Sequence, residues 1–350
     1  MRARCGSCQP GVYGVLIFEA TYTRRCVMRY RTFGRLGWRV SEVGYGMWGL
    51  AGWTGSDDAQ TRAALEESVR LGCTFFDTAW AYGQGRSERF LGELVRAHPE
   101  KRLYTATKIP PKNLTWPARA DFPLDDVFPP DHIRQYAESS LENLGLESID
   151  LLQFHVWEDA WARDARWQRA MDDLKREGLI NAVGISVNRW EPENGIETLR
   201  TGVIDAVQVI YNIFDQNPED VLFPVCRDLG VAVIARVPFD EGSLTGSITR
   251  STRFPEGDFR RLYFGPENLG PTMDRVDRLT PLVPLGSTLP EIALRFVLGN
   301  ADVATVIPGM RQTKNVRANV RASDLGPLDA ALVERLRAHR WDRKPTAWSA

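Results

Sequence analysis

The chain has 350 residues, 43% of them hydrophobic and 25% charged, and its formal net charge is −1. This composition is typical of a globular protein long enough to bury one large core or two ordinary ones. A net charge near zero argues against a nucleic-acid-binding protein, and no apolar run approaches the ~20 residues that a membrane-spanning helix requires.

The first 27 residues differ from the rest of the chain. They hold three of the five cysteines and several arginines around a short apolar stretch, without a clear signal-peptide core or cleavage site. We expect residues 1–27 to be a disordered extension and residues 28–350 to form one domain. Cys5 and Cys8 have metal-ligand spacing, but no second pair follows, so we expect no metal site. The cysteines make no disulfide framework, which favours a reducing, cytoplasmic location.

From residue 28 onwards, strand-like and helix-like segments alternate. A hairpin is expected first, with strands at 30–33 and 38–41. Apolar runs then predict eight strands, at 43–48, 74–79, 103–109, 149–155, 181–187, 205–211, 231–237 and 303–308. Helical segments follow them at 58–71, 87–97, 131–144, 165–178, 192–201, 219–229, 289–299 and 314–322. This repeat predicts an α/β fold, a (β/α)8 TIM barrel, with the hairpin and extra helices at 272–280 and 328–339 outside the repeat.

Glycines punctuate the predicted repeat. They stand where five of the helices should end: Gly72, Gly145, Gly178, Gly202 and Gly230. Only glycine adopts the left-handed conformation after a helix without a steric penalty, so these positions support the predicted boundaries.

Three consecutive predicted strands end in ionisable groups. Asp77 ends one strand and Tyr82 follows in the loop, while Lys108 and His155 end the next two strands. Because the carboxyl ends of parallel barrel strands meet at one rim, we expect these four side chains to lie together. Tyrosine has a free pKa of about 10, so it needs a nearby cation to act as an acid catalyst, and Lys108 is the leading candidate. Each residue taken singly also has a structural explanation.

A glycine-rich segment resembles a dinucleotide fingerprint but lacks its context. Gly44-Tyr45-Gly46-Met47-Trp48-Gly49 matches G-x-G-x-x-G after a predicted strand. That motif requires its third glycine to open a helix whose N-terminus holds the pyrophosphate. Gly52 and Gly55 follow instead and predict a loop, so we do not expect a Rossmann site here.

The strand ends resemble those of the aldo-keto reductase family, over most of the chain from about residue 31 to residue 340. Asp77-Thr78-Ala79 with Tyr82-Gly83 and Ser87-Glu88 is similar to the family signature, Thr107-Lys108 to its lysine, and Gln153-Phe154-His155 to its Gln-x-His strand. The resemblance implies an NAD(P)H-dependent reductase that converts an aldehyde or ketone into an alcohol by hydride transfer, with Tyr82 as the general acid. It further implies that Lys108 stabilises the phenolate of Tyr82, that Asp77 holds Lys108 charged, and that His155 orients the carbonyl.

The resemblance also implies a nicotinamide dinucleotide site. Its expected contacts are Met47, Asp77, Ser186, Asn188, Gln208, Arg236, Pro238, Gly242, Leu244, Gly246, Pro308, Gly309, Arg311, Asn315 and Asn319. Two positions depart from the family pattern. Val187 stands where the family has an asparagine, with Asn188 one residue later. Arg236 stands where an aromatic ring commonly stacks on the nicotinamide, so that stacking is either lost or made by the guanidinium plane.

The segment after the last predicted strand bears on the choice of cofactor. Arg311 suits stacking on adenine and pairing with a 2′-phosphate, and Arg317 is a candidate second cation. We therefore expect NADP(H) to be favoured, with NAD(H) as the alternative.

Aromatic residues crowd the loops at the expected rim and the tail. They are Trp48, Trp53, Trp80, Trp116, Trp157, Trp161, Trp341 and Trp348. We expect Trp48, Tyr82, His155 and Trp157 to contact a small carbonyl substrate with apolar or planar groups. The alternative is that several tryptophans only pack loops against the barrel. No exposed stripe predicts an oligomeric state.

Two rival functions keep the same residues. One is a cofactor-binding regulatory subunit, like the similar potassium-channel β subunits. The other is a Schiff-base aldolase with Lys108 as the nucleophile, although a lysine beside Asp77 is paired rather than free to react.

Overall fold

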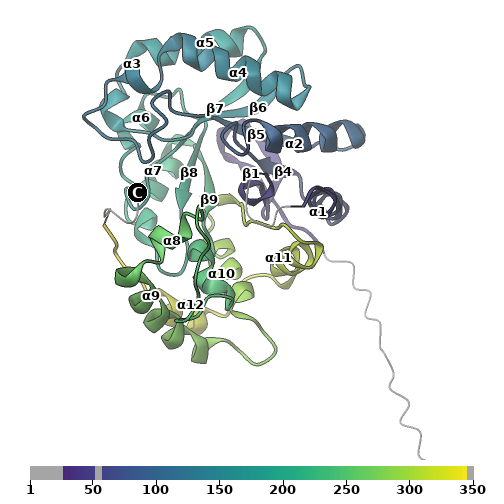
Figure 1. Ribbon diagram of the computed structural model, residues 1–350, viewed down its shortest axis with the longest axis vertical. Helices are drawn as coiled ribbons and strands as arrows, with labels where there is room; N and C mark the ends of the chain where they lie inside the picture. Colours follow the sequence, from purple (N-terminus) through teal and green to yellow (C-terminus); the bar gives the residue numbers. More distant parts are fainter. Residues whose placement is uncertain (1–26, 52–56, 345–350) are drawn as a thin grey trace, which may run out of the picture.

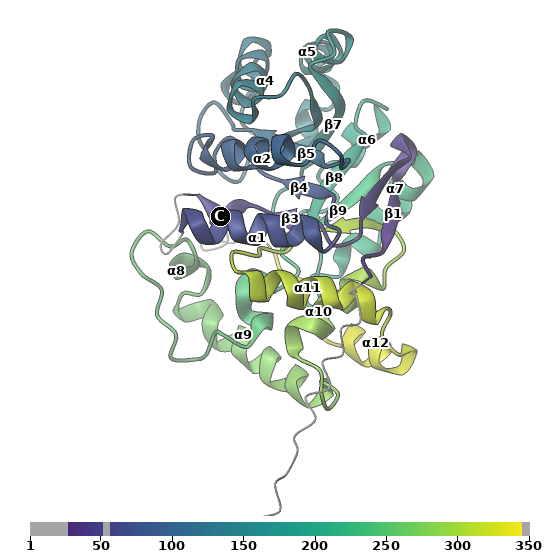
Figure 2. The same cartoon turned by 90° about the vertical axis from the view of Figure 1, so that its right-hand side faces the viewer.

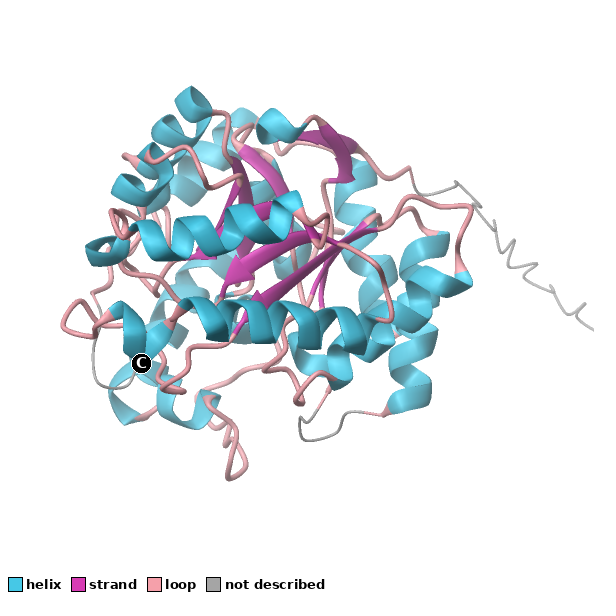
Figure 3. Cartoon of the chain, turned by 90° about the horizontal axis from the view of Figure 1, so that it is seen from above, coloured by secondary structure: helices cyan, strands magenta, loops and turns pink. Residues whose placement is uncertain are grey.

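The computed structural model describes residues 27–51 and 57–344 of the chain. Almost all of the predicted extension, as well as Trp53 and Trp348, lies outside the described residues. In the described part, helices enclose a central set of strands (Figures 1 and 3).

The central sheet has eight parallel strands that lie side by side in chain order. They are β3 (Tyr45–Gly46), β4 (Phe75–Asp77), β5 (Tyr104–Ile109), β6 (Ile149–Phe154), β7 (Ile180–Ser186), β8 (Ala206–Ile210), β9 (Ala232–Arg236) and β10 (Val303–Val306). Parallel bridges pair Val43 with Val306 and Gly46 with Gly309, so the first strand meets the last. The predicted (β/α)8 barrel is confirmed.

The glycines of the apparent dinucleotide fingerprint serve this closure. A Cβ on Gly44 would lie 2.9 Å from Oγ1 of Thr305, and one on Gly46 would lie 2.5 Å from the carbonyl oxygen of Ile307. The chain continues as the short 3₁₀ helix η2 (Trp48–Leu50), not as a helix that could hold a pyrophosphate. The glycines of this motif therefore allow the first and last strands to pack closely.

Helices cover the outside of the barrel. Those of the repeat are α1 (Asp58–Arg70), α2 (Arg86–Ala97), α4 (Pro130–Leu144), α5 (Ala165–Arg176), α6 (Ile196–Arg200), α7 (Leu222–Leu229), α10 (Leu289–Leu298) and α11 (Thr313–Leu325). α1 packs beside α11, as expected where a ring of helices closes (Figure 2). No helix in the described ranges is both long and apolar enough to cross a membrane.

Four further helices lie outside the repeat: α3 (Leu124–Val127), α8 (Arg260–Tyr263), α9 (Pro266–Leu279) and α12 (Ala330–Arg337). α9 and α12 were expected, but α9 begins earlier than predicted, and the short α3 and α8 were not predicted. The five glycines expected at helix ends all have positive φ, from 61° at Gly145 to 94° at Gly72.

The predicted hairpin covers the amino-terminal end of the barrel. β1 (Tyr30–Phe33) and β2 (Trp38–Ser41) pair in antiparallel fashion. Phe33 is fully buried and stacks on Phe75, the first residue of β4, with 5.3 Å between ring centroids. The backbone N–H of Arg35 donates to the carbonyl oxygen of Gly230, just before β9, at 2.6 Å. Because the hairpin fills this end, the opposite end, with the carboxyl ends of the strands, is left for a site.

Candidate active site

The ends of β4 and β5 bring an aspartate and a lysine into contact. Asp77 and Lys108 are both almost fully buried, and Lys108 Nζ donates to Asp77 Oδ2 at 2.6 Å. The ammonium also donates to the carbonyl oxygen of Thr78 at 2.8 Å and lies 3.5 Å from the hydroxyl oxygen of Tyr82. Since Lys108 donates a hydrogen bond to the oxygen of Tyr82, the phenolic O–H is left to donate to another acceptor.

A tight turn between β4 and α2 positions Tyr82. Its backbone N–H donates to the carbonyl oxygen of Ala79 at 3.0 Å. Gly85 in this turn has φ +80°, and a Cβ there would lie 2.2 Å from Nδ2 of Asn143. Only glycine fits that position, so the sequence of the turn fixes where the phenol lies.

Two glutamines orient Asp77 from the far side of the barrel. Nε2 of Gln153 in β6 and Nε2 of Gln208 in β8 donate to Asp77 Oδ1 at 3.0 and 2.8 Å. Gln153 has room because β7 carries Gly184 beside it, where a Cβ would lie 2.8 Å from Gln153 Cγ. Asp77 therefore holds Lys108 with one oxygen while the other oxygen is held by amides.

Burial and the charge of the neighbouring residue shift the pKa in opposite directions for both Tyr82 and Lys108. Burial raises the pKa of Tyr82, and Lys108 offsets only part of the increase, so the pKa stays above its usual value. For Lys108, burial lowers the pKa, but Asp77 and Tyr82 outweigh burial and raise it. Tyr82 is therefore a protonated phenol and Lys108 an ammonium at neutral pH.

His155 follows β6 and faces Tyr82, with 5.6 Å between ring centroids in an edge-to-face arrangement. Trp116 meets it in the same way at 5.7 Å. Burial, and then Lys108 and Arg236, lower the pKa of His155 well below its usual value, so the imidazole is neutral. Its Nδ1 is buried and has no hydrogen-bond partner within residues 27–51 and 57–344. A buried polar atom of this kind is typical of a place that a ligand completes.

Arg236 ends β9 on the same rim. Its Nη2 donates to the carbonyl oxygen of Val187 at 3.0 Å, while its buried Nε has no partner in the described part of the chain. Burial, and then the neighbouring Arg189, lower the pKa of Arg236 to about 10. Arg236 is therefore a second cation at the rim that holds Lys108.

The loops after β9 and β10 carry most of the expected dinucleotide contacts. Leu244 in η5 (Asp240–Thr245) is fully buried. A Cβ built on Gly246 or Gly309 would meet no described atom within 4 Å, so the backbone of both loops is open to a large ligand. Gly49 lies against Arg311, where a Cβ would be 3.1 Å from Arg311 Cδ.

The other expected dinucleotide contacts differ in their exposure. Met47 is fully buried, and its backbone N–H donates to the carbonyl oxygen of Asp77 at 2.9 Å. Ser186 pairs with Gln208 in the strand register, and both are buried. The remaining positions divide into the buried Pro238, Pro308 and Asn319 and the exposed Asn315.

Two expected contacts are occupied elsewhere. The amide nitrogen of Asn188 donates to Ala118, Glu158 and Glu191, at 2.9 to 3.2 Å, and is not left for a carboxamide. Trp157 has no exposed surface, because its ring packs among other aromatic rings and its Nε1 donates to Thr198. The prediction that Trp157 contacts the substrate is therefore disfavoured by its packing.

The expected second cation for a 2′-phosphate is also occupied. Arg317 Nε lies 2.6 Å from Glu67 Oε1, and Glu67 also pairs with Arg70. Hydrogen bonds from Arg70, which outweigh the effect of burial, and then from Arg317 lower the pKa of Glu67 to about 2. Arg317 is therefore held by a carboxylate on α1.

Comparisons with known proteins match most of this chain. The model of the aldo/keto reductase family matches residues 42–340. The chain belongs to the aldo/keto reductase family. The NADH-specific methylglyoxal reductase of Escherichia coli (strain K12) is 29% identical over 306 residues, which cover 83% of this chain and 92% of the relative. The aldo-keto reductase yakc [NADP(+)] of Schizosaccharomyces pombe is 28% identical and covers 84% of this chain and 87% of its own.

Solved structures of the family also match this aldo/keto reductase. The holo form of aldo-keto reductase AKR11C1 from Bacillus halodurans has a TM-score of 0.73 and 27% identity, and covers 93% of this chain and 100% of its own. A probable voltage-gated potassium channel subunit beta of Oryza sativa subsp. japonica is 27% identical over 86% of this chain and 93% of its own length. Reductases and a channel subunit thus both lie among the relatives.

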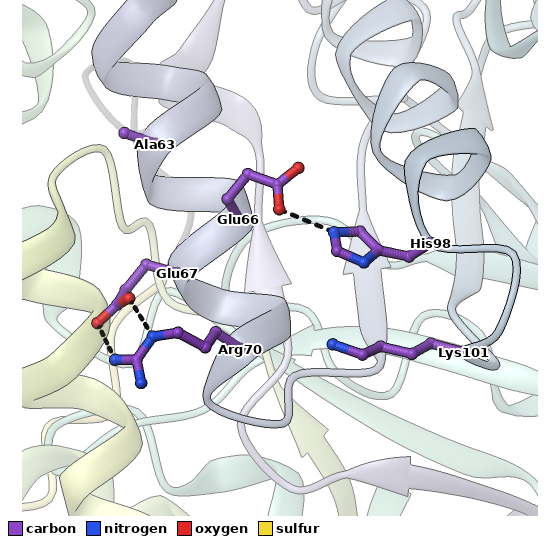
Figure 4. A pocket seen from close by; sticks show the side chains of 6 residues that line it. All are labelled: Ala63, Glu66, Glu67, Arg70, His98 and Lys101. Atoms are coloured by element: carbon purple, nitrogen blue, oxygen red, sulfur yellow. Dashed lines mark hydrogen bonds and ion pairs between the residues drawn. The ribbon is translucent and has the colours of Figure 1, made fainter.

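A surface cleft of about 320 Å³ lies away from these residues. It is lined by Ala63, Glu66, Glu67, Arg70, His98 and Lys101, from α1 and the segment after α2 (Figure 4). Glu66 and His98 face each other across it at 2.8 Å. The helices of a (β/α)8 barrel run antiparallel to its strands, so the carboxyl ends of α1 and α2 lie at the end opposite to Lys108. The cleft is not part of the candidate active site.

Sequence reasoning missed several contributors to the site. Gln153 was noticed only as part of a motif, although its amide orients Asp77. Trp116 was counted among rim aromatics without its contact to His155. Alternation along β6 was the available signal for Gln153, because a polar residue two positions before His155 lies on the same face of the strand.

Proposed function

We propose that the protein is an NADP(H)-dependent reductase that converts an aldehyde or ketone carbonyl into an alcohol, with Tyr82 as the general acid. The observation that carries this proposal is the buried Lys108 ammonium, 2.6 Å from Asp77 and 3.5 Å from the hydroxyl of Tyr82. A cation in this place favours the phenolate that forms when Tyr82 gives up its proton.

The residues present fit a nicotinamide dinucleotide. Unpartnered buried nitrogens on His155 and Arg236 and the open backbone at Gly246 and Gly309 lie on loops of the same rim. When bound, the cofactor would supply the hydride that adds to the carbonyl carbon. Ser186 and Gln208 would hold its amide end, and Arg236 would lie flat against the ring in place of the usual aromatic side chain.

The side chains then carry out the proton chemistry. His155 stays neutral and donates a ring N–H to the carbonyl oxygen, which fixes its direction. Tyr82 gives its proton to the same oxygen as negative charge develops there, and Lys108 stabilises the resulting phenolate. Asp77, held by Gln153 and Gln208, keeps Lys108 charged and in place.

NADP(H) is favoured over NAD(H) because of Arg311, whose guanidinium suits a 2′-phosphate. Arg317 already pairs with Glu67, so the preference rests chiefly on the place of Arg311 after β10. The relatives include an NADH-specific enzyme and one named for NADP(+), which is why the choice is tested directly.

We propose small carbonyl compounds with apolar or planar groups as substrates. Trp48 and Trp116 are 40% and 39% exposed, and Leu114 lies close to Trp116 in the same loop with 66% of its surface exposed. Trp116 contacts His155, so a substrate at the imidazole would meet this aromatic surface.

The test is steady-state reduction of a panel of aldehydes and ketones, with NADPH and NADH supplied at equal low concentration. We expect NADPH-dependent turnover that is faster with aromatic than with small polar aldehydes. No turnover with either cofactor contradicts the proposal, and a clear NADH preference contradicts the role of Arg311.

A regulatory subunit is the second candidate function, because the rice potassium-channel β subunit is among the relatives. A regulatory subunit would bind NADPH with little or no turnover across the panel. The Schiff-base alternative is weaker, because Lys108 is an ion-paired ammonium. Borohydride treatment with substrate should leave the mass of the protein unchanged.

A further inference from the structure

A buried ionic cluster lies beside the loop proposed to hold the dinucleotide. Arg343, in the segment after α12, is 7% exposed. Its Nε donates to Asp215 Oδ1 at 3.0 Å, and its Nη2 donates to Asp240 Oδ1 at 2.8 Å. Its Nη1 donates to the hydroxyl of Tyr263 at 2.6 Å, and that hydroxyl donates to Asp240 at 2.7 Å. One guanidinium thus joins the loops after β8 and β9 to α8.

Aromatic rings enclose the same guanidinium. Arg343 lies over the ring of Trp190 at 4.7 Å and over that of Trp341 at 4.8 Å. The backbone N–H of Trp341 donates to the carbonyl oxygen of Phe214 at 2.8 Å, and Arg275 of α9 covers its ring at 4.2 Å. Aromatic packing as well as ion pairs therefore hold the end of the described chain against the loops of the barrel. Trp341 and Arg343 lie beyond residue 340, where the family match ends.

The loop that Arg343 holds has an unfavourable backbone. Val237, Asp240 and Glu241 have φ values of 56°, 45° and 54°, in the left-handed region that residues with side chains rarely adopt. Such conformations persist when surrounding contacts determine them, and they gather at functional sites.

A second ion pair fixes the neighbouring residue of this loop. Arg189 Nη2 lies 2.7 Å from Glu241 Oε1, and both side chains are mostly buried. Asp240 and Glu241 are thus each tied to an arginine from a distant part of the chain. Ser243 adds a hydrogen bond to Asp240 Oδ2 at 2.7 Å. A buried ion pair gives little net stability, so two of them on consecutive strained residues call for another explanation.

We propose that Arg343 is a positioning residue that holds η5 in the conformation that receives the cofactor pyrophosphate. This inference rests on the proposed function, since it assigns the loop after β9 to the dinucleotide. Arg343 is not itself proposed as a cofactor contact. It acts through Asp240, because a loop already in its bound shape loses less freedom when the ligand binds.

The test compares the full-length protein with Arg343→Gln, Arg343→Lys and a matched control, Arg340→Gln. Arg340 lies in the same segment, but it pairs with Asp220 near the surface. Each protein is titrated with NADPH by fluorescence quenching, and KM for NADPH and kcat are measured at saturating carbonyl substrate. We expect Arg343→Gln to raise Kd and KM for NADPH by about tenfold or more while kcat changes by less than about threefold.

The conservative variant separates positioning from general stability. Arg343→Lys should recover part of the affinity because it keeps the charge near Asp240, and Arg340→Gln should behave as the unaltered protein. An Arg343→Gln protein that binds NADPH as tightly as the unaltered one overturns the inference. If that variant does not fold, Tyr263→Phe decides, because it removes one hydrogen bond of Arg343 and one of Asp240 and keeps every charge. It should raise KM for NADPH about threefold, and an unchanged KM overturns the inference.

The unaltered protein provides the separate check on the proposed function. If it binds neither NADPH nor NADH, the proposed function and this inference both fail. If the unaltered protein binds NADPH and the Arg343 variants bind it equally well, the inference alone fails.

Discussion

Replacing Asp77 by asparagine should separate the buried Lys108 from its counterion. Asp77 Oδ2 lies 2.6 Å from Lys108 Nζ, which corresponds to about 6 kcal/mol of attraction at an effective dielectric constant of about 20. Much of this attraction offsets desolvation, so removing one partner of a buried pair typically costs about 3–5 kcal/mol. Asparagine keeps the shape, but its amide must face a donor, either the ammonium or the amides of Gln153 and Gln208. We expect Asp77→Asn to lower the free energy of unfolding by about 3–5 kcal/mol.

This loss of stability should depend on pH in one direction. In the native protein, burial lowers the pKa of Lys108, but Asp77 and Tyr82 outweigh burial and raise it. Without the charge of Asp77, burial prevails, and the pKa of Lys108 in the folded variant falls below the unfolded value of about 10.4. The deficit should therefore be larger at about pH 7 than at about pH 10.

Urea unfolding at several pH values measures the deficit, and carbonyl reduction at saturating cofactor measures its chemical consequence. Turnover should fall at least about 100-fold, because Lys108 loses the carboxylate that holds it charged and in place beside Tyr82. Asp121→Asn removes an exposed partner of Arg119 and should unfold at the same urea concentration as the native protein. An Asp77→Asn protein with native stability and native turnover would refute this reasoning.

Substitutions at three further residues test separate parts of the account. Burial, and then Lys108 and Arg236, lower the pKa of His155, so its neutral form adds stability above about pH 6.5 that is lost as the pH falls. His155→Gln should reduce the difference in unfolding free energy between about pH 7 and pH 5, and an unchanged difference would contradict the assignment. Arg236→Ala should weaken NADPH binding by about 2- to 30-fold in a fluorescence titration, and Arg236→Tyr should weaken it less, whereas equal affinities would exclude stacking. Arg311→Ala should weaken binding of NADPH at least about tenfold more than binding of NADH, and equal losses would remove the 2′-phosphate contact.

Local sequence signals predicted the barrel well. The eight strands, the hairpin and the five helix-ending glycines depend on patterns within a few residues, and the structure has all of them. Asp77, Lys108 and Tyr82 lie together as expected, because parallel strands bring their carboxyl ends to one rim.

The details that sequence did not predict depend on contacts between distant residues. Arg317 was predicted as a phosphate ligand, but it pairs with Glu67, which is 250 positions away in the sequence. Asn188 is held by Ala118 across 70 positions. Arg343 sits in a tail that had no recognised pattern, and only the fold brings it to Asp240. Periodicity and spacing carry no information about such pairs.

The net pKa of Tyr82 is another such case. A nearby lysine was expected to lower it, and Lys108 does act in that direction. Burial has the larger effect and raises the pKa, because the free energy needed to remove the phenolate from water exceeds its attraction to the lysine. The free protein therefore keeps the phenol protonated, which suits a residue that donates a proton.

The role of Tyr82 is tested most directly by Tyr82→Phe, with NADPH binding and carbonyl reduction measured on the same sample. Phenylalanine keeps the ring beside His155 and removes only the hydroxyl. The account predicts an unchanged Kd for NADPH and a loss of at least about 100-fold in turnover. Native turnover in a variant that binds NADPH normally would contradict Tyr82 as the general acid.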